Sequence, residues 1–267
     1  MTQTLDAPGL WRTYALHAEA MLSAGPTPDV TRSDVSFLIL SGAPHVDLNQ
    51  AAIFGDGDRR AARAIVEAVH AADVPCLLGV SSTVRDDVST TLVAGGFEAT
   101  PQREALFFAD EPPQRGPTAF QVRRIRSDDD RAGALRVLIE AHDYAADLVA
   151  AMWGPALLDR PDVGGWVAWD GDEPVSCVYV TRVGRTLGFF DMMTPPRHRR
   201  RGAGRAVLSN ALAEAWSWDG ADADHVECWA TPAGRPLYES MGFTVADEID
   251  VWTYGATPED LAAVGVG

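Results

Sequence analysis

The chain has 267 residues, a formal net charge of −16 and 46% hydrophobic residues, which describes a globular protein large enough for two domains. Its acidity argues against general binding to nucleic acid or to anionic membranes, and no apolar run reaches the roughly 18 residues of a membrane span. The first residues carry neither a basic start nor an apolar run, so we expect a cytoplasmic protein. Its three separated cysteines are expected to be reduced, without a metal site.

The first half predicts a helix over residues 59–73, a strand over 75–80 and a second apolar strand at 105–108. Residues 109–118 are rich in proline, which donates no backbone hydrogen bond, and this composition is typical of a linker. We therefore divide the chain into a first domain over residues 1–112, a linker over 113–118 and a second domain over 119–267.

The second half predicts alternating strands and helices. A strand at 120–125 precedes a helix that begins at the capping Ser127, and three antiparallel strands follow over residues 164–193. A helix at 205–218, a strand at 225–231, a short helix at 235–241 and a closing strand at 250–255 complete the order β-α-β-β-β-α-β-α-β.

A Gly-Phe pair recurs in the two halves. Gly96–Phe97 and Gly242–Phe243 are each followed by an apolar strand, and the offset between them is 146 residues. A helix and a strand precede each pair in the same order. The chain is therefore interpreted as an internal duplication.

An arginine cluster interrupts this acidic chain. The sequence contains no lysine, yet five arginines fall within residues 197–205, around Gly202 and Gly204. A strand, a glycine turn and a helix N-terminus in succession favour an anion, because the first helical N–H groups lack partners and glycine lets a phosphate approach closely. A solvated charge run and a nucleic-acid patch are the alternatives, although no aromatic residues alternate with the arginines.

Two nucleotide motifs are excluded. Val207 stands where the dinucleotide fingerprint needs its third glycine, and the phosphate loop requires a lysine. The remaining pattern, R-x-x-G-x-G over residues 199–204, resembles the acyl-CoA pyrophosphate loop of the GNAT acetyltransferases. The segment ATPAGRPLYESMGF over residues 230–243 resembles the closing segment of that family. The resemblance covers about residues 120–254.

The resemblance implies two GNAT-like domains, each a mixed, mostly antiparallel α/β sheet flanked by helices. It implies an acyltransferase that uses acetyl-CoA as cosubstrate and moves the acetyl group directly to the amine of a small molecule, without nucleic-acid or membrane partners. A catalytically weak acyl-CoA-binding or sensing module is the alternative. The second half alone is expected to bind acetyl-CoA.

The resemblance also implies residue roles. Tyr238 matches the tyrosine that protonates the leaving thiolate, and Asp191 is the first candidate for the general base, with Glu227 and His142 as alternatives. Thr231 stands near the place of an asparagine that contacts the pantetheine arm. The implied cofactor-binding residues are Met192, Met193, Thr194, Arg199, Arg200, Arg201, Gly202, Ala203, Gly204, Arg205 and Thr231.

The first half lacks this chemistry. Leu92 occupies the place of the tyrosine, and Asp56 and Asp58 would repel a diphosphate, so the first domain is interpreted as degenerate and without cofactor. His45, Asp47 and Asn49 either line an acceptor cleft between the halves or form a loop that leads into a strand.

Overall fold

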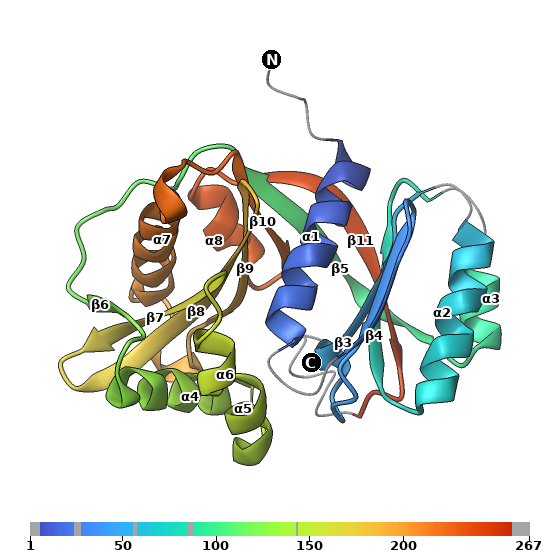
Figure 1. The fold of residues 1–267 in the computed structure, drawn as a ribbon, viewed down its shortest axis with the longest axis horizontal. Coiled ribbons are helices and arrows are strands. Elements are labelled where there is room, and N and C mark those ends of the chain that lie inside the picture. Colours follow the sequence, from blue (N-terminus) through green and yellow to red (C-terminus); the bar gives the residue numbers. More distant parts are fainter. Residues whose placement is uncertain (1–5, 24–27, 56–57, 85–87, 143, 258–267) are drawn as a thin grey trace. The chain divides into compact units, whose positions relative to one another are not determined.

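The computed structural model describes residues 6–23, 28–55, 58–84, 88–142 and 144–257, which form two compact units (Figure 1). The first unit comprises Met1–Phe107, Trp229–Tyr238 and Thr244–Gly267, and the second comprises Phe108–Cys228 and Glu239–Phe243. The predicted linker lies just after the first change of unit, at residue 107. The chain then returns to the first unit near its end, so neither unit is continuous in sequence.

The first unit is built on a mostly antiparallel sheet with strand order β1-β2-β3-β4-β11-β5. Strands β3 and β4 are parallel, whereas β1–β2, β2–β3 and β4–β11 are antiparallel. Its elements are α1 (Ala7–Leu22), β1 (Asp29–Arg32), β2 (Ser36–Leu40), the 3₁₀ turn η1 (Val46–Leu48), β3 (Asn49–Ile53), α2 (Asp58–Ala72), β4 (Cys76–Ser81), α3 (Val88–Ala94), β5 (Glu98–Ala109) and β11 (Thr244–Tyr254).

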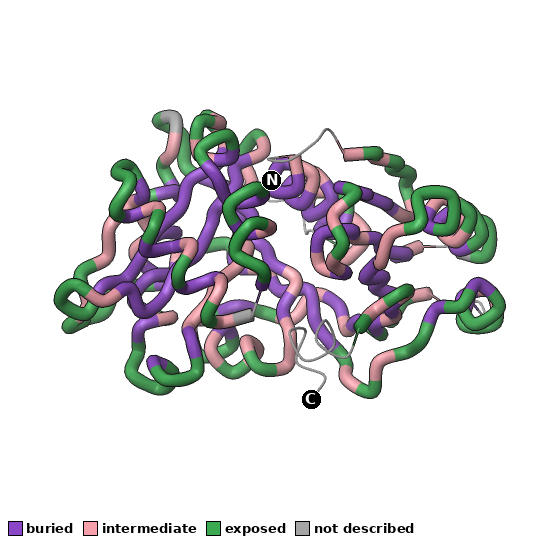
Figure 2. The backbone as a smooth tube through the Cα atoms, turned by 90° about the horizontal axis from the view of Figure 1, so that it is seen from below, coloured by how far each residue is buried: buried purple, intermediate pink, exposed green. Residues whose placement is uncertain are grey.

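Two apolar layers hold the first unit together. Helices α2 and α3 pack on one group of strand residues, and Leu92 of α3 is fully buried in this cluster. Helix α1 contributes Trp11, which stacks on Phe54 at 5.8 Å between ring centroids and meets Trp229 edge to face at 5.5 Å. Figure 2 shows such buried residues in purple along the backbone, with exposed residues in green at loops and outer helix turns.

The second unit has a sheet with strand order β10-β9-β8-β7-β6. Only β9–β10 is parallel among these pairs. Its elements are β6 (Gln121–Arg124), α4 (Asp128–His142), α5 (Ala146–Met152), α6 (Pro155–Leu158), β7 (Val163–Asp170), β8 (Glu173–Val183), β9 (Thr186–Met193), η2 (Pro196–His198), α7 (Ala203–Ala215), η3 (Trp218–Gly220) and β10 (His225–Ala230). The ends of β5 and β10 and of α8 (Arg235–Ser240) have residues in the other unit, so these three elements belong to both.

Strand β8 is the centre of the second unit. Every residue of it from Pro174 to Arg182 is buried, so both of its faces are covered, and α4 and α7 both pack against it. The long helix expected from Ser127 to Trp153 is divided into α4 and α5, and the short helix α6 follows it. Ser127 does cap the first of these helices, because its Oγ accepts a hydrogen bond from Asp130 N at 3.1 Å.

The repeated Gly-Phe pairs have the same structural role. Gly96 and Gly242 take left-handed φ angles of 76° and 92° directly after α3 and α8, and β5 and β11 begin one residue after each phenylalanine. Glycine reaches this conformation without a Cβ clash, which ends the helix and redirects the chain into a strand. The order β3-α2-β4-α3-β5 thus recurs as β9-α7-β10-α8-β11.

The fold class is confirmed as mixed α/β with mostly antiparallel strands flanked by helices. The closing strand differs from the sequence interpretation, which assigned it to the second half. Strand β11 pairs with β4 of the first unit, with Val251 opposite Gly79. Polar contacts fix it there, because buried Asp247 accepts hydrogen bonds from Trp11 and Ser82. Among the described residues, no helix is long and apolar enough to cross a membrane.

Candidate active site

Strand β9 contains a bulge at the position of the candidate base. The register with β8 moves from Tyr179–Phe190 to Cys177–Met193, so Asp191 and Met192 together face a single residue of β8. Asp191 has a left-handed φ of 49°, which is unusual for a residue with a side chain. The parallel register with β10 runs from Thr186 to Gly188, while β9 continues to residue 193. The two strands therefore diverge before the bulge.

The side chain of Asp191 is held from α5. The indole Nε1 of Trp153 donates a 2.7 Å hydrogen bond to Oδ2 of Asp191. On the β8 side, burial and then the charge of Asp191 raise the pKa of the Cys177 thiol well above its ordinary value. Burial is also the main cause of the raised pKa of Tyr179, followed by Cys177 and Asp191. Asp191 is thus a half-buried residue whose carboxylate accepts the Trp153 N–H and lies near the neutral side chains of Cys177 and Tyr179.

The end of β9 is fixed by Ser176 of the neighbouring strand β8. Its Oγ donates to the carbonyl of Met193 at 2.6 Å and lies 2.9 Å from Oγ1 of Thr194. The Thr194 carbonyl accepts a 3.0 Å hydrogen bond from Nε of Arg199. Met192, Met193 and Thr194 are half-buried. The turn that leaves β9 is therefore rigid before any ligand binds.

The loop before α7 has the backbone of an anion site. Arg200 and Gly202 have left-handed φ angles of 64° and 89°, with Arg201 between them. Alternation of left-handed and other conformations turns successive N–H groups toward one side, which forms an anion-binding nest. Helix α7 starts at Ala203, and its N-cap Gly202 has no side chain that could cap the helix. The N–H groups of the first helical turn thus join those of the loop.

The five arginines of the cluster differ in their partners. Arg197 pairs with Glu140 and Glu173, and Arg201 pairs with Asp170. Arg205 donates to the carbonyl and hydroxyl oxygens of Ser240, at the end of α8. Together with the Arg199–Thr194 contact, these interactions occupy four guanidinium groups. Within the described part of the chain, Arg200 is exposed and has no hydrogen-bond or ion-pair partner.

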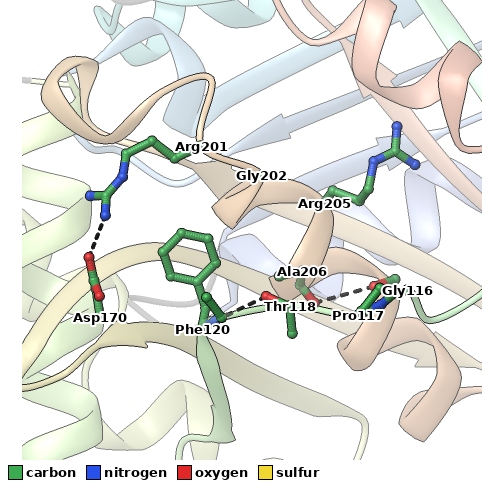
Figure 3. A pocket seen from close by; sticks show the side chains of 11 residues that line it. Gly116, Pro117, Thr118, Phe120, Asp170, Arg201, Gly202, Arg205 and Ala206 are labelled. Atoms are coloured by element: carbon green, nitrogen blue, oxygen red, sulfur yellow. Dashed lines mark hydrogen bonds and ion pairs between the residues drawn. The ribbon is translucent and has the colours of Figure 1, made fainter.

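A cavity of about 320 Å³ lies beside this loop (Figure 3). Arg201 reaches across it to Asp170, and its guanidinium carbon lies 5.7 Å from the centre of the Phe120 ring. Arg205 points in the opposite direction in the same view. The rest of the lining is mainly linker backbone and α7: Gly116, Pro117, Thr118, Ala119, Gly202, Ala206 and Ser209.

Thr231 lies at the start of the closing segment and Tyr238 lies in its middle, and both belong to the first unit. The carbonyl of Thr231 accepts hydrogen bonds from Gly234 N and Arg235 N, which form the turn into α8. Tyr238 is 6% exposed, and its ring packs edge to face on Phe107 at 5.8 Å between centroids. The roles of these two residues toward acetyl-CoA stay predictions.

Of the two alternative bases, the structure describes the side chain of Glu227 only. Glu227 is fully buried on β10, where its Oε2 lies 3.5 Å from Nε2 of the buried His225. A fully buried carboxylate beside a histidine has no direct path to an amine that arrives from solvent. The side chain of His142 lies outside the described residues. The choice of base stays a prediction, with Asp191 as the first candidate.

The polar stretch of the first half forms a loop that leads into a strand. Fully buried Asn49 donates to the carbonyls of Ala43 and His45 and accepts from Gly42 N. His45 caps η1 by accepting from Asp47 N at 3.2 Å. Residue 56 and the side chain of Asp58, expected to repel a diphosphate, lie outside what the structure describes. The degenerate state of this half stays a prediction.

Sequence reasoning missed Trp153, Tyr144 and Ser176. Trp153 stands before Gly-Pro directly after α5, and nothing in this local sequence indicates its contact with Asp191. Tyr144 stacks on Trp153, with ring centroids 5.7 Å apart. Ser176 stands between the apolar Val175 and Cys177, where a buried hydroxyl needs a partner. That pattern could have suggested a polar contact, but not its partner.

Comparisons with known proteins agree with this geometry. A family model described as an acetyltransferase (GNAT) domain matches residues 161–245. A curated relative, the uncharacterized N-acetyltransferase YsnE of Bacillus subtilis (strain 168), is 25% identical over 145 residues, which are 51% of this chain and 95% of the relative.

Two solved structures share the fold. A GCN5-related N-acetyltransferase from Kribbella flavida superposes with a TM-score of 0.66 at 16% identity, over 92% of this chain and 96% of that one. A tandem GNAT protein from the clavulanic acid biosynthesis pathway, solved without AcCoA, gives a TM-score of 0.57 at 15% identity, over 90% and 88% of the two chains. The matched residues 161–245 include the bulge and the loop before α7, so this chain is an enzyme that carries an acetyltransferase domain of the GNAT family.

Proposed function

We propose that this protein transfers the acetyl group of acetyl-CoA directly to the amine of a small molecule. The observation that carries the proposal is the loop before α7, where the left-handed Arg200 and Gly202 and the open first turn of the helix form one anion nest. The diphosphate of acetyl-CoA fits such a nest, since backbone N–H groups and a helix N-terminus both favour phosphate oxygens.

The residues divide into three groups by task. The loop from Arg199 to Arg205 binds the diphosphate, with Arg200 as the guanidinium of the cluster that has no hydrogen-bond or ion-pair partner within the described residues. Met192, Met193 and Thr194 offer backbone groups to the pantetheine arm, beside the diverging end of β9. Thr231 supplies a further contact to that arm.

Acetyl-CoA supplies an activated thioester. The amine nitrogen bonds to the carbonyl carbon, the carbon–sulfur bond breaks, and no acyl-enzyme is required. Asp191 takes the proton that the amine loses, and Tyr238 gives a proton to the departing sulfur. The partial exposure of Asp191 supports the first of these roles, because a base that accepts a proton from an arriving amine cannot be fully enclosed.

Isothermal titration with acetyl-CoA tests the loop. Gly202→Asp places a side chain and a negative charge in the nest, and we expect binding to be lost. The matched control is Gly184→Asp, because Gly184 is also left-handed, also lies in open space and belongs to a hairpin turn between β8 and β9. Equal affinity in the two variants would contradict the assignment of the loop.

A thiol-release assay with acetyl-CoA and a panel of amines tests the transfer. Turnover with at least one small amine supports the acetyltransferase reaction. Tight binding of acetyl-CoA without turnover over polyamines, amino acids, aminoglycosides and peptide N-termini would support an acyl-CoA-sensing module instead. The two assays therefore separate binding from chemistry.

A further inference from the structure

Trp153 and Asp191 come from different elements of the second unit and meet through one hydrogen bond. The indole Nε1 donates to Oδ2 of Asp191 at 2.7 Å, which is short for a nitrogen donor and typical of a bond to a charged acceptor. Trp153 is only 3% exposed, so water competes little for this contact. A donor in this position favours the ionised carboxylate.

Both partners are fixed before substrate binds. Tyr144 is 6% exposed and stacks on the Trp153 ring with an interplanar angle of 21°. The backbone of Asp191 is held in its left-handed conformation by the bulge of β9. Such backbone conformations cost free energy and persist where the surrounding structure determines them, commonly at functional sites. The indole and the carboxylate are therefore preorganised relative to each other.

We propose that Trp153 is a positioning residue, which keeps Asp191 ionised and oriented to accept the proton of the acceptor amine. The role in the reaction rests on the proposed function. The contact itself does not, because the titration of Asp191 can be followed without any amine.

Two acids of β8 lie near Asp191. Burial raises the pKa of both Cys177 and Tyr179 above ordinary values that are already basic. Trp153 donates to Asp191 from the end of α5 and carries no charge in the acid range. The transition of Asp191 itself is recognised because it is followed on the Asp191 side-chain signal and is absent from Asp191→Asn.

Carbon-13 NMR of the full chain with labelled aspartate side chains measures the contact. Asp191→Asn identifies the signal by its disappearance. Trp153→Phe keeps an aromatic ring against Tyr144 and removes the indole N–H. We expect the Asp191 midpoint to move upward by about one pH unit in Trp153→Phe, the equivalent of one hydrogen bond to a charged group.

Trp169→Phe is the matched control. Trp169 is a 5% exposed residue of β7 in the same unit, and within the described residues its Nε1 has no hydrogen-bond partner. This substitution removes the same atoms without removing a carboxylate contact. It should leave the Asp191 midpoint unchanged.

The kinetic readout uses the first amine that the panel shows to be acetylated. The acid limb of kcat/KM against pH should move upward with the NMR midpoint in Trp153→Phe and stay in place in Trp169→Phe. An unchanged midpoint in a folded Trp153→Phe would overturn the proposal, even if activity fell. A moved midpoint with an unmoved kinetic limb would overturn the role of Trp153 in the reaction.

A measurement on the wild type covers the case in which Trp153→Phe does not fold. The ¹⁵N–H signal of the Trp153 indole should shift with pH at the Asp191 midpoint, and this transition should disappear in Asp191→Asn. An indole signal that does not follow Asp191 would overturn the proposal. If no amine is acetylated, these NMR results still decide whether the contact acts on Asp191.

Discussion

Trp11 and Asp247 are separated by 236 residues in the sequence, and the Trp11 indole donates a 2.8 Å hydrogen bond to Oδ2 of Asp247. The other oxygen of Asp247 accepts from the backbone N and the hydroxyl of Ser82 at 3.2 and 2.8 Å. One buried carboxylate of β11 thus joins α1 and the end of β4. The last strand of the chain is held within the first unit by polar contacts as well as by strand pairing.

We expect Asp247→Ala to destabilise the protein by about 2–4 kcal/mol, because three donors lose their acceptor and the Trp11 indole is buried. Urea unfolding followed by tryptophan fluorescence measures this. The control is Asp250→Ala on the same strand, where an exposed ion pair with Arg103 should contribute less than about 1 kcal/mol. Equal losses in the two variants would argue against a special role for Asp247.

The position of β11 changes what we expect of a fragment that contains only the second half of the chain. The sequence suggested that the second half alone binds acetyl-CoA, but β11 lies between β4 and β5 of the first unit. A fragment of residues 119–267 would expose both edges of this strand, so we expect it to aggregate or to bind acetyl-CoA weakly. Co-expression with residues 1–118 should restore binding in titration calorimetry. Full affinity in the isolated fragment would contradict this expectation.

The arginines of the loop should differ in their effect on acetyl-CoA affinity. Arg200→Ala removes the guanidinium that has no partner within the described residues, and we expect affinity to fall by about tenfold or more. Arg201→Ala removes a group already paired with Asp170, so its effect should be several times smaller. Titrations at low and high salt check the cause, because the Arg200 contribution should shrink as salt screens an exposed phosphate contact.

Glu104 should make the stability of the first unit depend on pH. Burial and then the charge of Asp47 raise the pKa of Glu104 to about 8, and the Trp229 indole offsets part of this rise. A carboxyl group with a raised folded-state pKa stabilises fully below its unfolded value of 4.5, and this contribution is lost as pH rises through about 8. Wild-type stability should therefore fall over this window.

Glu104→Gln should remove this fall in the free energy of unfolding, which is on the order of a few kcal/mol at most between the two pKa values. Urea unfolding at several pH values between about 5 and 8 measures it. Glu98→Gln, an exposed position at the start of the same strand, should keep the wild-type slope. A Glu104→Gln protein with the wild-type slope would show that another group is responsible.

Local signals in the sequence predicted much of the fold. Gly96 and Gly242 mark helix ends because their conformation depends on their own backbone, and a strand follows each of them as expected, although β5 and β11 begin earlier than predicted, at Glu98 and Thr244. The partner of β11 could not be predicted in this way. Strand pairing depends on residues far apart in the sequence, such as Val251 and Gly79, and the alternation of apolar residues is the same for any partner.

The candidate site could also be predicted from the sequence only in part. The glycine turn and the arginine cluster indicate an anion site, and the loop has a backbone suited to one. Which arginine keeps its charge available depends on Glu140, Glu173 and Asp170, whose positions near the loop are set by the packing of α4, β7 and β8. The GNAT resemblance implies a bulge near Met192, but the left-handed conformation of Asp191 within it is known only from the structure.

Tyr238 gives the last test of the mechanism. If its hydroxyl protonates the leaving thiolate, Tyr238→Phe should lower the rate constant of acetyl transfer by roughly 10²–10⁴-fold, while acetyl-CoA affinity changes little. The ring would keep its contact with Phe107, so the packing of α8 should survive the change. Single-turnover transfer to an amine found in the panel measures the chemical step apart from product release.

A loss near the lower bound would still support the role of Tyr238, because phenol and thiol have similar ordinary pKa values and water can replace part of the acid's function. Tyr254→Phe is the matched control, since Tyr254 packs on Phe97 and His70 in the first unit and should not affect the rate. A Tyr238→Phe enzyme as fast as the wild type would remove Tyr238 from the chemistry. The thiolate would then have to leave unprotonated or take its proton from water, and the tyrosine would serve only to pack α8 against Phe107.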